Sequence, residues 1–113
     1  MARKPEGATP QFGRYAPDQA VYGISVAAEL MNLAPQTLRV YEARGLIEPS
    51  RTSGGTRRYS DDDLGRIQHI NELLEIGLNL AGIKLVLEME VENQRLRAEL
   101  GETRARLKRY EDS

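Results

Sequence analysis

The sequence predicts a mainly α-helical fold, a winged helix-turn-helix domain with a small β-hairpin wing followed by a long C-terminal coiled-coil helix. Three observations predict it: two short helical segments joined by a tight turn, a basic hairpin around two glycines, and a C-terminal heptad pattern. We expect a flexible N-terminal arm over residues 1–21, the winged-helix domain over 22–90 and a dimerisation helix over 86–113. Within the domain, the helix-turn-helix covers about 24–44 and the wing about 50–59.

The arm is rich in proline and glycine and shows neither helical nor strand periodicity, which is typical of a flexible segment. Its basic residues are either solvated or placed to touch phosphates; they are Arg3, Lys4 and Arg14.

The first helix of the pair is expected to begin at Ser25, whose side chain can act as an N-cap. Val26, Leu30 and Leu33 then form an apolar stripe at helical spacing. This helix spans about two turns, and Leu33 lies where the pattern breaks into the turn.

Pro35 predicts the start of the second helix, because proline is tolerated at the first helical position. The helix is expected to run to about Arg44, where Gly45 ends it. If Leu38 faces the core beside Val26, positions 36, 39, 40 and 43 lie on the outer face.

The wing is predicted from Gly54-Gly55, a pair that can form a two-residue hairpin turn. That turn places Arg51 opposite Arg58, a mildly destabilising pair of like charges. With Arg57 added and few acids nearby, the hairpin makes most sense if phosphates supply negative charge. The alternative is a solvated loop with incidental arginines.

A third helix is expected to begin after Ser60, with Asp63 placed for a variant of the capping box. Gly77 ends it, and Asn79 is a plausible cap for a last helix that begins at Leu80 and continues, kinked or unbroken, to the C-terminus.

The last helix carries an apolar heptad stripe that a lone helix would leave in water, and a two-stranded coiled coil would cover it. Charges flanking the stripe favour a parallel pair, because Glu92 would then face Arg97 and Glu99 would face Arg104. The residues expected to form the dimer are Val86, Met89, Asn93, Leu96, Leu100 and Leu107.

Composition excludes several classes of site. The chain has no cysteine and a single histidine, so thiolate metal sites, disulfides and cysteine nucleophiles are excluded, and no metal or cofactor is expected. The acidic run at 61–63 is explained by helix capping, and we expect no enzyme activity. No run of about 18 apolar residues occurs, so the sequence predicts a soluble, cytoplasmic protein without a membrane partner.

The middle of the chain resembles the MerR-type family of winged-helix regulators. The resemblance covers residues 22–90 and rests on TLRVYEARGLI after a short helix, RRYSDDDLGRI after the glycine turn, and the GLNLAGIK link, all in the family's order. Within the family, PQTLRVY and NLAGIK look nearest to the short heat-shock repressor (HspR-like) branch. That branch represses chaperone operons at inverted repeats with the chaperone DnaK as co-repressor.

The resemblance implies a DNA-binding surface made by the second helix and the wing. Gln36 could read adenine, Arg39 guanine or a phosphate, and Val40 a thymine methyl group. Tyr41 and Tyr59 could each face the DNA or instead pack in the core with the hydroxyl in water. The DNA-binding residues expected are Gln36, Thr37, Arg39, Val40, Tyr41, Arg44, Arg51, Arg57, Arg58 and Tyr59.

The function expected is a homodimeric, sequence-specific regulator, acting as a repressor at an inverted repeat in the nucleoid, with stress or chaperone genes as targets. Its partners would be double-stranded DNA, a second copy and a protein co-regulator such as a chaperone. The family's dimer is antiparallel, contrary to the charge argument, and the orientation stays open. Alternatives are an architectural, excisionase-like protein that bends DNA, or an adaptor that works through its coiled coil.

Overall fold

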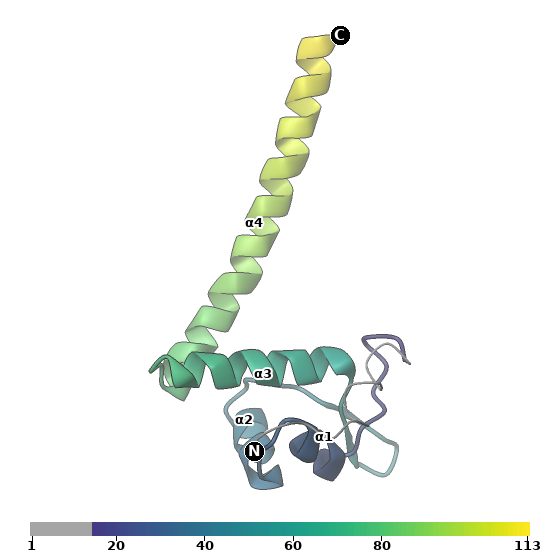
Figure 1. The fold of residues 1–113 in the computed structure, drawn as a ribbon. Helices are drawn as coiled ribbons and strands as arrows, with labels where there is room; N and C mark the ends of the chain where they lie inside the picture. The colour runs from purple at the N-terminus through teal and green to yellow at the C-terminus, as the bar shows by residue number, and fades with distance from the viewer. Residues whose placement is uncertain (1–14) are drawn as a thin grey trace.

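The computed structural model describes residues 15–113, which form four helices and one two-stranded hairpin. The elements are α1 (Ile24–Leu30), α2 (Pro35–Ala43), β1 (Ser50–Arg51), β2 (Arg57–Arg58), α3 (Asp61–Glu75) and α4 (Leu80–Asp112). In Figure 1, α3 lies across α1 and α2, and α4 projects away from them. This architecture confirms the predicted fold class. Arg3, Lys4 and Arg14, the basic residues expected to be solvated or to touch phosphates, lie outside the described residues.

The short helix α1 differs in phase from the sequence prediction. It begins at Ile24 after the N-cap Gly23, so Ser25 lies inside the helix and caps nothing. Val26 is 46% exposed, whereas Ala27 and Ala28 are buried. The core face of α1 is made by Ala27, Ala28 and Leu30, followed by Met31 at the C-cap, so Leu30 faces the core as predicted and Val26 does not.

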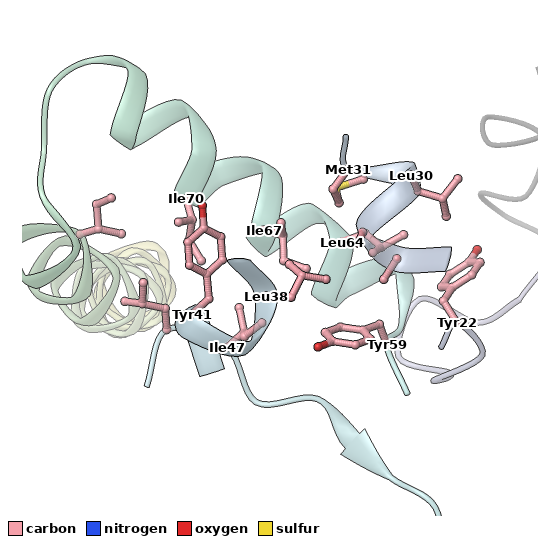
Figure 2. Close-up of a cluster of buried hydrophobic side chains, with 14 of the residues drawn as sticks. Tyr22, Leu30, Met31, Leu38, Tyr41, Ile47, Tyr59, Leu64, Ile67 and Ile70 are labelled. Carbon is pink, nitrogen blue, oxygen red and sulfur yellow. The ribbon is translucent and has the colours of Figure 1, made fainter. Parts of the chain in front are cut away.

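The core is one cluster to which α1, α2, α3 and the base of α4 all contribute. Leu38 of α2 is fully buried, as the sequence predicts. Figure 2 shows Leu38 beside Ile67 of α3. This packing fixes which face of α2 remains outside, and so positions the candidate site.

The long helices begin and end where the sequence predicts. Ser60 and Asp63 form a reciprocal capping box at the start of α3, with hydrogen bonds of 3.0 and 2.8 Å. Gly77, at φ +104°, follows the end of α3. The Asn79 side chain accepts a bond of 2.7 Å from the backbone N–H of Gly82 and caps α4, which runs unbroken for 33 residues.

The segment before α1 is tied to the domain by backbone hydrogen bonds. The carbonyl of Pro17 accepts from the N–H of Asp62, and the N–H of Val21 donates to the carbonyl of Tyr59. Tyr22 and Tyr59 form an antiparallel bridge. Residues 17–22 thus join the base of the wing and the start of α3.

The hairpin register differs from the one predicted. Arg51 pairs with Arg57 and Ser50 with Arg58, so the strands are offset by one residue. The N–H of Thr52 donates to the carbonyl of Thr56, leaving a three-residue loop that ends at Gly55 with φ +85°. A three-residue loop of this kind uses one glycine in the left-handed region, whereas the predicted two-residue turn needs two such residues.

Candidate nucleic-acid interface

The outer face of α2 carries the exposed side chains that the sequence predicts. Gln36, Arg39, Val40 and Ala43 are all exposed, and Thr37 is half-buried. The Arg39 guanidinium lies 3.4 Å from the Gln36 amide oxygen, so the two polar side chains sit side by side. A short helix with this exposed face, held to the domain by a buried leucine, is the form of a recognition helix.

Tyr41 does not belong to this face, contrary to the prediction that it faces DNA. Its side chain is 3% exposed, and its hydroxyl donates a hydrogen bond of 2.8 Å to the Asn71 side chain of α3. Burial raises the pKa of this hydroxyl. The physical reason is spacing, since Tyr41 follows Leu38 by three residues and shares its face of α2. Tyr41 therefore joins α2 to α3 (Figure 2).

Tyr59 is likewise buried, and the prediction that it grips the DNA backbone is wrong for this conformation. Its side chain has no exposed surface, and burial raises the pKa of its hydroxyl. Within residues 15–113 that hydroxyl has no hydrogen-bond partner. Tyr59 bridges to Tyr22 instead and anchors the base of the wing in the core.

An acidic residue lies beside the wing arginines, whereas the sequence had indicated few acids near them. Glu42 of α2 accepts from Arg57 Nε at 2.5 Å and from Arg51 Nη2 at 2.8 Å. Both arginines hold the pKa of the Glu42 carboxyl below its ordinary value, with the hydrogen bond from Arg57 the larger cause. The sequence analysis missed these ion pairs of Glu42. The available signal was that Glu42 is the one acidic residue of α2, close in sequence to the basic hairpin.

Arg58 and Arg44 complete the basic surface. Arg58 is half-buried, and its Nη1 donates to the carbonyl of Arg57 at 3.3 Å and lies against Gly23. Arg44 is exposed at the C-cap of α2. Among residues 15–113 no ion pair engages Arg39, Arg44 or Arg58, so no carboxylate of that range neutralises their charges.

The stripe of α4 that the sequence predicts to form a dimer lies mostly on the part of the helix that projects from the domain. Every side chain from 88 to 113 is exposed, and Val86 is half-buried. Leu96, Leu100 and Leu107 are 50%, 48% and 56% exposed. An open hollow of about 760 Å³ at the base of this stripe is lined by His69 and Glu90, which hydrogen-bond to each other, and by Val86, Met89, Asn93, Gln94 and Arg97.

A helix-turn-helix with a basic wing and a projecting helix matches one family of regulators. The family model for MerR HTH regulatory proteins covers residues 22–90. The chain belongs to the MerR family. Members of this family are transcriptional regulators and not enzymes, as the sequence predicts for this MerR domain.

Two curated relatives support this assignment. The chain is 46% identical over 91 residues to a Streptomyces coelicolor protein named as the heat shock protein HspR, covering 80% of this chain and 60% of that protein. It is 40% identical over 74 residues to the transcriptional regulator GlnR of Bacillus anthracis, covering 66% and 57%. The MerR chain thus spans about 60% of the length of these relatives.

Solved structures of MerR regulators share the fold. HiNmlR, a MerR family regulator lacking the sensor domain and bound to promoter DNA, is 31% identical, with a TM-score of 0.59 over 80% of this chain and 78% of that one. The N-terminus of MtaN, the multidrug transporter activator of Bacillus subtilis, is 29% identical, with a TM-score of 0.57 over 76% and 96%.

Within residues 15–113 there is neither a helix suited to span a membrane nor a cluster of metal-binding side chains. No helix in this range has the length and apolar composition needed to span a bilayer. The same residues contain no group of three or more His, Asp or Glu side chains placed to hold a metal ion.

The lowered pKa of Glu42 predicts a pH-dependent stability. Its ion pairs contribute fully above the ordinary pKa of glutamic acid, about 4.3, and are lost as the pH falls through the lower pKa of the folded state. We expect Glu42→Gln to lower the free energy of unfolding by about 1 kcal/mol at pH 7 and by less at about pH 3. Urea unfolding at both pH values measures this. An equal difference at both would show that the ion pairs contribute nothing.

Proposed function

We propose that this chain is a homodimeric, sequence-specific DNA-binding repressor that acts at an inverted-repeat operator. The observation that carries the proposal is the outer face of α2, where Gln36, Arg39 and Val40 are exposed together on a helix fixed by Leu38. These three side chains can offer a bidentate contact to adenine, one to guanine and an apolar contact to thymine. The likeness to a MerR regulator bound to promoter DNA supports the same ligand.

A second copy of the chain is the proposed partner of α4. A helix of 33 residues is about 50 Å long, and within the described residues every side chain from residue 88 onward is exposed. Its stripe of half-exposed leucines would be buried in a two-stranded coiled coil. A two-fold dimer would place two copies of α2 on the two halves of an inverted repeat.

Stress or chaperone genes are the proposed targets, and repression the proposed effect. The support is the 46% identity to a protein named as a heat shock protein. A chaperone co-repressor stays a prediction of the same resemblance. Because the ligand is chromosomal DNA, we place the activity in the cytoplasm, at the nucleoid.

The direct test begins by selecting duplexes from a random library with the full chain. Fluorescence anisotropy then compares the best duplex with a shuffled one across a salt series. We expect a preference of about a thousandfold or more and an affinity that falls steeply with salt. Equal, weak binding to both duplexes would favour an architectural protein, and no binding at low salt would favour an adaptor.

Arg39→Ala should weaken binding to the selected duplex by about 10- to 100-fold, because a base contact is worth about 1–3 kcal/mol. The affinity for the shuffled duplex should fall less, since that duplex offers Arg39 no matching base. Arg109→Ala is the control, because it removes the same charge from an exposed position near the end of α4. An equal loss of affinity in Arg39→Ala and Arg109→Ala would contradict a base contact by Arg39.

A further inference from the structure

We propose that Glu42 is a positioning residue of the DNA interface, which withholds Arg51 and Arg57 from the phosphates and fixes the wing against the recognition helix. The inference rests on the proposed DNA binding and adds a determinant of its sequence-independent affinity and its salt dependence. The sequence-independent attraction to DNA then comes mainly from the arginines that Glu42 does not engage, which are Arg39, Arg44 and Arg58.

The geometry gives each oxygen of one carboxylate its own arginine. Glu42 Oε1 accepts from Arg57 Nε and Oε2 from Arg51 Nη2. Arg51 Nη1 also donates to the carbonyl of Gly55 at 3.0 Å, within the loop of the wing. The Glu42 side chain is 22% exposed, so these contacts are partly shielded from solvent. A single side chain of α2 therefore holds both strands of the hairpin.

The register of the hairpin makes this carboxylate necessary. Arg51 and Arg57 are direct partners across the two strands, and like charges in that position repel. Glu42 lies within 2.8 Å of both and offsets the repulsion. The three side chains carry a net charge of +1 instead of the +2 that the two arginines would present alone.

Arg39 and Arg58 differ from this pair. Neither takes part in an ion pair within the described part of the chain, and Arg39 shares the exposed face of α2 with Gln36. Non-specific affinity grows with the number of phosphates that cations neutralise, whereas base contacts set sequence preference. By occupying two wing arginines, Glu42 lowers the non-specific contribution and leaves the base contacts of α2 intact.

The test compares Glu42→Gln with Glu48→Gln, which changes the net charge equally at an exposed position after α2. Anisotropy is measured on the selected and the shuffled duplex between 50 and 300 mM salt. Relative to Glu48→Gln, we expect Glu42→Gln to bind the shuffled duplex about 5- to 20-fold more tightly, with a salt slope steeper by about 1–2. The affinity for the selected duplex should rise by a similar factor, because the added phosphate contacts carry no sequence information.

Two results would overturn the proposal. One is an unchanged affinity and salt slope for Glu42→Gln relative to Glu48→Gln; the other is weaker binding to the shuffled duplex. A wild-type chain that binds no duplex at low salt would contradict both this inference and the proposed function. A wild-type chain that binds both duplexes equally would contradict only the sequence-specific function, because the salt slopes still test Glu42.

A measurement on the wild-type chain covers the case in which Glu42→Gln does not fold. The side-chain Nε–Hε signals of Arg57 and Arg39 can be followed by NMR as shuffled duplex is added. We expect the Arg39 signal to move and the Arg57 signal to stay close to its position in the free protein, because Glu42 retains it. A larger movement for Arg57 than for Arg39 would overturn the proposal.

Discussion

Replacing Leu96 and Leu100 together with lysine is expected to convert the dimer to monomers and to remove most of the affinity for an inverted repeat. Both leucines lie in the middle of the exposed stripe of α4. Burying one leucine contributes about 1.5–3 kcal/mol, and a dimer would bury four of these side chains, two from each chain. We therefore expect the dissociation constant of the dimer to rise by at least about 100-fold.

The DNA affinity should fall with the dimer. Two linked half-site contacts bind about 100- to 10,000-fold more tightly than one, and a monomer loses that advantage. Sedimentation equilibrium and anisotropy on the same samples measure the two effects. The matched control is Ala98→Lys with Ala105→Lys, which adds the same charge to exposed positions outside the stripe. A wild-type monomer, or equal binding by the two double variants, would contradict the coiled-coil dimer.

Leu38→Ala is expected to give the largest loss of stability, about 2–5 kcal/mol. Leu38 is fully buried where α2 meets the rest of the core, so truncation leaves a cavity that the neighbouring side chains fill only in part. For a domain of this size, we expect the melting temperature to fall by about 10–30 °C.

Val40→Ala is the control for Leu38→Ala, since it lies two residues along the same helix and is 37% exposed. Its melting temperature should stay within about 3 °C of the wild type, because exposed substitutions usually cost about 0.5 kcal/mol or less. Thermal unfolding followed by circular dichroism compares the two variants. Equal shifts would contradict the orientation of α2 on which the candidate site depends.

Much of the fold follows from local sequence signals. The capping residues Ser60 and Asn79 and the glycines at 45 and 77 predict the ends of the helices, because their roles depend on a few neighbouring atoms. The buried face of α1 does not follow, because Val26, Ala27 and Ala28 are all apolar and only the packing against the rest of the domain decides which of them is buried.

The errors at the candidate site have a common physical cause. Tyr41 and Tyr59 are amphipathic, and composition alone allows a tyrosine to face either DNA or the core. The three-residue spacing from Leu38 to Tyr41 favours the core, and the structure bears this out. The hairpin register depends on which glycine takes a positive φ, and two adjacent glycines leave that choice open.

The orientation of α2 toward DNA can be tested directly, because the chain contains no cysteine and a single thiol can be placed at will. Ala43→Cys places one thiol on the exposed face of α2, and Ala105→Cys places one far along α4 (Figure 1). Each is labelled with a chelated iron that cleaves nearby DNA, and each is bound to the selected duplex. We expect the label at 43 to cut both half-sites symmetrically, at centres about 10 base pairs apart or a multiple of that, and the label at 105 to leave the duplex intact. Cleavage from 105 and none from 43 would contradict the assignment of α2 as the recognition helix.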